Sequence, residues 1–82
     1  MKQFILSRRA LDDYTGLAKE LQKRVDKQLS LLVRNFLHPS LRAKKYDESR
    51  GIWQARVTDS VRFYFLIERD CFIILDIDKH RD

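Results

Sequence analysis

The C-terminal part of the chain predicts three consecutive β-strands, and this feature constrains the fold most. Residues 52–58 alternate between apolar and polar side chains, which is the period of a strand with two different faces. Two further apolar runs, residues 61–68 and 71–78, are rich in β-branched and aromatic side chains. The polar pairs Asp59-Ser60 and Arg69-Asp70 separate the runs and favour turns. We therefore expect a three-stranded antiparallel meander, with Phe63, Tyr64, Phe65 and Phe72 in its core.

The sequence before the meander predicts a short strand and two helices. Residues 2–6 are a strand candidate, and Ser7 is well placed to cap the helix that follows. Apolar side chains recur at steps of three and four from residue 8 to about residue 20, and again to about residue 36, as on one face of a helix. Gly16 weakens the helix around it. We favour a helical hairpin over one long helix, because a hairpin buries more apolar surface against a small sheet.

A polar connection leads from the helices to the meander. The residue before Pro39 is disfavoured in helical torsions, so the helical region ends there. Residues 40–51 are predominantly polar and are predicted as a connection without further strands. The order strand, helix, helix, three strands predicts one α+β domain over residues 1–82. Its helices should pack on one face of a mainly antiparallel sheet and leave the other face free for function.

Composition narrows the classes of partner. The formal charge of +5 favours a polyanionic partner. One cysteine permits no internal disulfide, and two widely separated histidines give no zinc-ligand spacing, so we expect neither a metal nor another cofactor. No apolar run approaches the roughly 20 residues that a membrane-spanning helix needs, and residues 1–7 do not resemble a signal peptide. We therefore expect a cytoplasmic protein.

Four sequence segments, taken in order, carry a resemblance to a known family: Lys44-Lys45, Gly51-Ile52-Trp53-Gln54-Ala55-Arg56-Val57, Val61-Arg62-Phe63-Tyr64 and Ile77-Asp78-Lys79-His80-Arg81. The chain resembles the RelE/ParE superfamily of bacterial toxin–antitoxin toxins. Members share the order strand, helix, helix, three strands, with a lysine-bearing connection, a W-x-x-R-V/I strand, a Y/V-R-F/V-x-Y/F strand and a last strand ending in a His- or Arg-containing segment.

The resemblance implies a toxin but leaves two activities open. RelE-like members cut messenger RNA, usually on the ribosome, whereas ParE-like members poison DNA gyrase and need no nuclease residues. Fold alone does not choose between them. We favour the RelE-like branch, a metal-independent mRNA interferase; the alternatives are a gyrase inhibitor and a non-catalytic interaction module. The implied partners are a cognate antitoxin, mRNA and the ribosome.

The resemblance also implies which residues act on RNA. Cleavage by the adjacent 2′-hydroxyl needs a base, an acid and cations that stabilise the phosphorane. Arg62 matches the strand arginine that RelE-like nucleases use for the phosphate, and His80, whose ring titrates near neutrality, matches a His or Arg position at the end of the last strand. Lys44 and Lys45 match a basic pair near the scissile phosphate. The expected RNA-positioning residues are Arg56, Lys79, Arg81 and Arg42. For these cations and for His80, the alternative is an ordinary surface or chain-end role.

Overall fold

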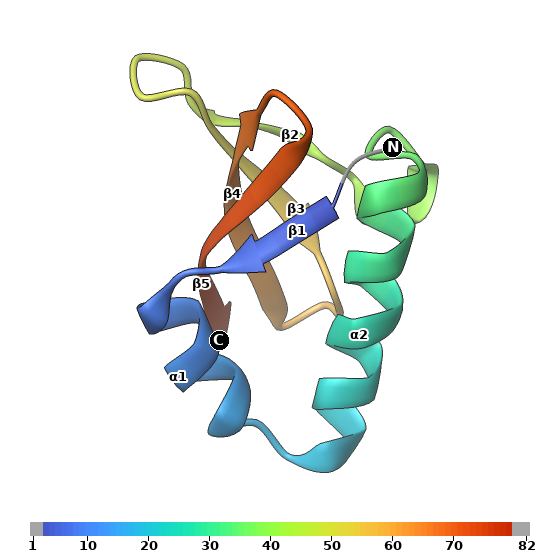
Figure 1. Cartoon of the computed structure of the whole chain (residues 1–82). Coiled ribbons are helices and arrows are strands. Elements are labelled where there is room, and N and C mark those ends of the chain that lie inside the picture. The colour runs from blue at the N-terminus through green and yellow to red at the C-terminus, as the bar shows by residue number, and fades with distance from the viewer. Residues whose placement is uncertain (1–2, 80–82) are drawn as a thin grey trace.

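A computed structural model describes residues 3–79 of the chain (Figure 1). Two α-helices and one short 3-10 helix accompany a five-stranded mixed sheet with the strand order β1-β5-β4-β3-β2. β1 pairs with β5 in parallel, and the other neighbours are antiparallel. The expected α+β class is confirmed. The elements are β1 (Gln3–Leu6), α1 (Arg8–Thr15), α2 (Lys19–Arg34), η1 (Pro39–Leu41), β2 (Lys44–Asp47), β3 (Ile52–Arg56), β4 (Val61–Glu68) and β5 (Cys71–Lys79).

The predicted meander forms, and its alternation separates a buried face from an open face. In β4 the side chains of Phe63 and Phe65 are fully buried, whereas those of Arg62 and Tyr64 are partly exposed. A β-bulge interrupts the β4–β5 register between Ile74 and Asp76. Because the extra residue changes the alternation, Ile74 and Ile77 can both lie in the core. The expectation that Tyr64 lies in the core is therefore wrong, because Tyr64 is on the opposite face from its neighbours Phe63 and Phe65.

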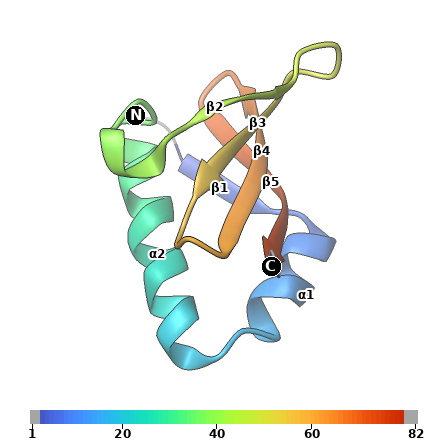
Figure 2. The same ribbon diagram turned by 180° about the vertical axis from the view of Figure 1, so that it is seen from behind.

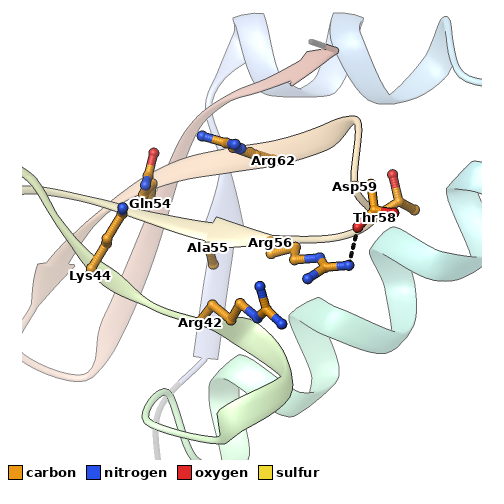
Figure 3. A pocket seen from close by; sticks show the side chains of 8 residues that line it. All are labelled: Arg42, Lys44, Gln54, Ala55, Arg56, Thr58, Asp59 and Arg62. Carbon is orange, nitrogen blue, oxygen red and sulfur yellow. Dashed lines mark hydrogen bonds and ion pairs between the residues drawn. The ribbon is translucent and has the colours of Figure 1, made fainter. Parts of the chain in front are cut away.

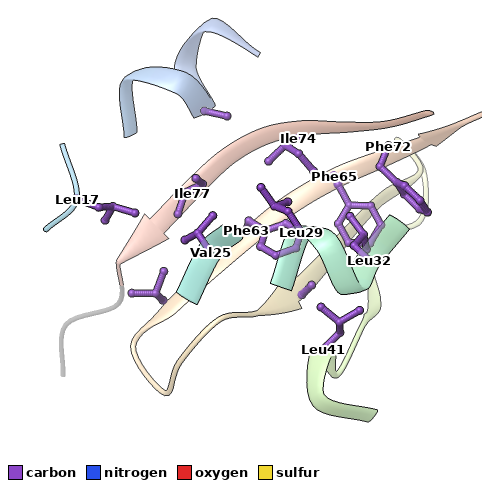
Figure 4. Packing of buried hydrophobic residues seen from close by; sticks show 13 residues of the cluster. Leu17, Val25, Leu29, Leu32, Leu41, Phe63, Phe65, Phe72, Ile74 and Ile77 are labelled. Carbon is purple, nitrogen blue, oxygen red and sulfur yellow. The ribbon is translucent and has the colours of Figure 1, made fainter. Parts of the chain in front are cut away.

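The helices cover one face and one edge of the sheet. α2 lies across the buried face, where Val25, Leu29 and Leu32 meet the apolar side chains of β4 and β5 (Figure 4). α1 packs against the part of β5 that extends beyond its pairing with β1, and Asp13 Oδ2 accepts a hydrogen bond of 3.0 Å from the Ile77 amide there. A side-chain acceptor thus covers a backbone donor on an otherwise unpaired strand edge.

The expected break between the helices is confirmed, and it comes at Gly16. α1 ends at Thr15 with Gly16 as its C-cap, and α2 begins at Lys19. The two helices diverge from this connection (Figure 1). Hydrogen bonds join their near ends, from Tyr14 Oη to Asp26 Oδ1 (2.8 Å) and from Gln22 Nε2 to the Tyr14 carbonyl (2.9 Å).

The Ser7 hydroxyl connects α1 to β5, as well as capping α1. It accepts a hydrogen bond from the Ala10 amide (3.0 Å) and donates one to the Leu75 carbonyl (2.7 Å). Ser7→Ala is therefore expected to lower the free energy of unfolding by about 1–2 kcal/mol, from the lost cap and the lost hydrogen bond. Urea unfolding measures this, with Ser30→Ala on the exposed surface of α2 as the control. Equal stability of the two variants would contradict the double role.

The connection before the meander contains a strand that the sequence analysis did not predict. Within residues 40–51, Leu41 is fully buried in η1, and β2 pairs antiparallel with β3 at the sheet edge. Lys44, Lys45 and Tyr46 are all exposed, so β2 lacks the apolar alternation of a half-buried strand. Charged side chains, lysine above all, are common on edge strands because they discourage pairing with other chains. The prediction of a connection without further strands is therefore wrong.

Within residues 3–79, no helix is both long enough and apolar enough to cross a membrane.

Candidate functional site

Polar side chains form two rows across the open face of the sheet. The first row runs from β2 to β5, with each residue opposite the next in register: Lys44, Gln54, Tyr64 and Asp76. The second row joins Arg56 on β3, Arg62 on β4 and Asp78 on β5. Because side chains directly opposite each other on one face are close neighbours, the open face brings together groups that are far apart in the sequence.

A cavity of about 240 Å³ lies beside β3, where the two rows meet the connection that follows η1 (Figure 3). Four of its lining side chains are cations and one is a carboxylate. The carboxylate, Asp59, forms an ion pair with Arg56. Within residues 3–79, the other three cations form no ion pair, so the cavity has a net positive charge. Its lining residues are Arg42, Lys44, Gln54, Ala55, Arg56, Thr58, Asp59 and Arg62.

The backbone holds these cations close together at a cost to the fold. Arg56 and Arg62 are direct cross-strand partners, and like charges in such a position are destabilising. Arg42 is the C-cap of η1 and has the left-handed backbone (φ 47°) in which helices commonly end. An anion bound between the two arginines would relieve their repulsion.

The predicted site residues fall into three groups. Arg42, Lys44, Arg56 and Arg62 are brought together in the cavity. Lys45 lies on the opposite face of β2 from Lys44, with its Nζ atom 5.8 Å from the centre of the Trp53 ring. Lys79 is the cross-strand partner of Val61, whose side chain is in the core, so Lys79 is not on the open face with Arg62. The structure therefore does not bring Lys44 and Lys45 to the same face of the sheet. His80 and Arg81 lie outside the described residues.

A second hollow on the open face contains residues that the sequence analysis did not single out. Its volume is about 280 Å³. The rings of Tyr46 and Tyr64 contact each other there, with their centres 4.8 Å apart. Burial, aided by nearby Asp78 and Tyr46, raises the pKa of Tyr64. Part of this group could have been predicted from the sequence, because the alternation Asp76-Ile77-Asp78 places both carboxylates on the same face of a strand. The lining residues are Arg9, Tyr46, Ile52, Tyr64, Leu75, Asp76 and Asp78.

Asp76 is the carboxylate with the least favourable surroundings in this hollow. Its Oδ1 atom is buried without a hydrogen-bond partner within residues 3–79, and its Oδ2 atom is 3.8 Å from Nε of the largely exposed Arg9. Burial raises the pKa of Asp76; Arg9 opposes this shift, and Asp13 and Asp78 add to it. The folded state thus binds the proton of Asp76 more tightly than an ordinary aspartate does.

Replacing Asp76 by asparagine is therefore expected to stabilise the protein at neutral pH. A pKa above the ordinary value of 3.8 means that the folded state binds the proton more tightly than the unfolded state does. The contribution of this group to stability is full below pH 3.8 and is lost as the pH rises through the raised pKa. The advantage of Asp76→Asn should therefore be large at pH 7 and vanish near pH 3.

Urea unfolding from pH 3 to pH 8 measures this difference, with Asp70→Asn in the exposed β4–β5 turn as the control. An Asp76→Asn variant that is less stable than the wild type at pH 7 would show that the ionised carboxylate stabilises the fold.

Within the part of the chain that the structure describes, no group of three or more His, Cys, Asp or Glu side chains is placed to hold a metal ion.

Several solved toxin structures share this fold over nearly the whole chain. The YoeB/ParE toxin from Agrobacterium tumefaciens matches with a TM-score of 0.81 and 13% identity, over 96% of this chain and 99% of that chain. The YoeB–YefM complex from Staphylococcus aureus matches with a TM-score of 0.79 and 19% identity, over 99% of this chain and 99% of that chain. The toxin–antitoxin complex RelBE2 from Mycobacterium tuberculosis matches with a TM-score of 0.79 and 20% identity, over 96% of this chain and 98% of that chain. The RelE/ParE-like fold expected from the resemblance is thus confirmed. No protein-family model and no curated protein matches the sequence.

Proposed function

We propose that this protein is a RelE-like toxin that cuts messenger RNA without a metal ion and thereby stops translation. The observation that carries the proposal is the cavity on the open face, where Arg42, Lys44, Arg56 and Arg62 converge with one carboxylate among them. A site with excess positive charge suits the phosphate at which RNA is cleaved, because negative charge increases there in the transition state. The shared fold with YoeB and RelBE2 supports the same class of protein.

In the proposed reaction, a ribose 2′-oxygen attacks the adjacent phosphorus while the bond to the 5′-oxygen breaks. The products are a 2′,3′-cyclic phosphate and a 5′-hydroxyl end. The Arg62 guanidinium can donate two parallel hydrogen bonds to the non-bridging oxygens, and Lys44 adds a point charge. The Gln54 side chain lies between these two cations on β3 and can hold the phosphate by a neutral hydrogen bond.

Proton transfer is assigned to His80 on the basis of the resemblance. Its role is to donate a proton to the leaving 5′-oxygen or to accept one from the 2′-hydroxyl. β5 leads to this residue: Asp78 stands opposite Arg62 in the second row, and Lys79 is the last residue of the strand. Asp78, the cross-strand partner of Arg62, is two residues before His80 in the sequence.

The proposed protein partner is an antitoxin that masks the basic face. Such a segment would combine acidic side chains with apolar anchors and become ordered as it binds. Exposed apolar side chains that could serve as contacts include Ile5 (57% exposed), Leu11 (46%) and Leu37 (65%). YoeB of Staphylococcus aureus was solved in complex with YefM, which supports a partner of this kind.

Pulse labelling after induction separates the candidate functions. Cells that express the chain should lose incorporation of labelled methionine before that of labelled thymidine, because the proposed target is mRNA. Co-expression of the cognate antitoxin should prevent both losses. Earlier loss of thymidine incorporation with chromosome breakage would assign the protein to the gyrase inhibitors, and normal growth would assign it to the non-catalytic modules.

A further inference from the structure

A second basic groove lies on the other side of Arg42 and Arg56 from the candidate site. Its volume is about 720 Å³, and α2, η1 and the end of β3 form its walls. Figure 2 shows the end of β3 next to the middle of α2, and η1 beyond the C-terminal end of the helix. Four of the lining side chains are cations and none is a carboxylate. The lining residues are Arg24, Lys27, Gln28, Pro39, Ser40, Arg42, Arg56 and Val57.

A buried glutamine joins the walls of this groove. Gln28 is 7% exposed, and its Nε2 atom donates to the carbonyl oxygens of Arg56 (2.8 Å) and Ser40 (3.3 Å). One amide thus ties α2 to β3 and to η1. Arg24 and Lys27 are three residues apart on α2, so they are neighbours on the helix surface. Both are exposed, and neither forms an ion pair within residues 3–79.

The groove adjoins the cavity, because Arg42 and Arg56 line both. A single track of cations therefore runs from the open face of the sheet, past the end of β3, to the surface of α2. Asp59, at the cavity, is the one carboxylate along it. Arg62 and Lys44 line the cavity, Arg56 and Arg42 line both hollows, and Lys27 and Arg24 line the groove.

We infer that this groove binds the backbone phosphates of the RNA strand next to the nucleotide held in the cavity. The identification of the polyanion as RNA rests on the proposed function. Exposed arginine and lysine side chains that meet phosphates position a strand without reading its bases. The groove should therefore add affinity that depends on the length of the RNA and on salt, but not on its sequence.

The lining favours a nucleic acid over an acidic protein segment. Pro39 and Val57 are the groove's main apolar side chains, and Val57 is only partly exposed. A segment that folds on binding needs apolar anchors to offset its loss of conformational entropy. A phosphate backbone needs only the cations and the polar groups of Gln28 and Ser40.

The test measures binding of single-stranded 2′-O-methyl RNA, which lacks the nucleophile and cannot be cleaved. Fluorescence anisotropy compares oligonucleotides of about four and about twelve nucleotides, lengths within the range of single-strand sites. The groove variant is Arg24→Ala with Lys27→Ala. The matched control is Lys19→Ala with Lys23→Ala, which removes two charges from the same helix but outside the groove.

The groove variant should bind the longer RNA about tenfold more weakly, and the slope of log K against log salt should become shallower by about 1.4, or 0.7 for each lost phosphate contact. Its affinity for the short RNA should change less than twofold. The control variant should bind both RNAs within about twofold of the wild type. Lys19 and Lys23 lie outside the groove, so in the wild type their charges act on the RNA only over a distance at which salt screens them.

Three outcomes would overturn the inference: no RNA binding by the wild type, equal losses in the groove and control variants, or an unchanged affinity for the longer RNA. Loss of antitoxin binding with intact RNA binding would assign the groove to the protein partner instead. Because the readout is binding, it does not depend on cleavage. A protein that shows the predicted pattern but cuts no mRNA would contradict the proposed function and leave the groove as an RNA site.

Discussion

Replacing Arg62 by alanine is expected to slow mRNA cleavage by about 10²–10³-fold, the usual loss when one group that stabilises transition-state charge is removed. Arg62 lines the cavity, forms no ion pair within residues 3–79 and lies opposite both Arg56 and Asp78. Its loss would leave the phosphorane charge to Arg56 and Lys44, and Arg56 is already paired with Asp59. The measurement is the single-turnover rate of mRNA cleavage on programmed ribosomes.

Two further substitutions separate the chemistry from general effects of charge. Arg62→Lys keeps the charge but cannot form two parallel hydrogen bonds, so it should recover only part of the rate. Arg69→Ala removes the same charge from the exposed β4–β5 turn and should cleave like the wild type. The variants should keep the stability of the wild type, because Arg62→Ala removes the repulsion from Arg56 and the attraction to Asp78 together. Wild-type cleavage by Arg62→Ala would remove Arg62 from the site.

Replacing Leu32 by alanine is expected to lower the free energy of unfolding by about 2–5 kcal/mol. Leu32 is fully buried on α2 in the core that faces β4 and β5 (Figure 4). Its truncation removes apolar contact and leaves a cavity that the neighbouring rings can fill only in part. Such a loss is a large share of the roughly 5–15 kcal/mol that stabilises a typical domain.

Leu37 provides a matched control for Leu32, because it is the same residue type but 65% exposed. Leu37→Ala should change the free energy of unfolding by less than about 0.5 kcal/mol, as surface substitutions usually do. Urea unfolding followed by Trp53 fluorescence measures both. Similar values for the two variants would mean that α2 does not pack on the sheet as described.

The sequence predicts the parts of the fold in which local pattern and burial agree. The meander was predicted correctly because its strands are half-buried and its turns are polar. The cap at Ser7 and the break at Gly16 follow from local chemistry in the same way. β2 was missed because an edge strand with exposed lysines has no apolar period to detect. The parallel pairing of β1 with β5 depends on packing between distant segments, which no local pattern records.

The candidate site was predictable where strand alternation places a residue on a face. The resemblance assigns Arg62 to the phosphate and Arg56 to the positioning of RNA, and the structure places these two strand residues opposite each other. The resemblance assigns Lys44 and Lys45 together as a basic pair, whereas adjacent residues of a strand point to opposite faces. The groove was missed because Arg24 and Lys27 look like the solvated side of an amphipathic helix. Only the tertiary fold brings them next to Arg42.

The measurement that tests the central claim most directly is a map of new mRNA 5′ ends, made within minutes of inducing the chain in cells. Parallel cultures express Arg62→Ala and His80→Ala at matched protein levels. We expect new ends that carry a 5′-hydroxyl inside translated regions, in phase with codons, and their loss in both variants. Growth arrest without new ends, or ends that persist in both variants, would contradict an RNA-cleaving site built on the open face of this sheet.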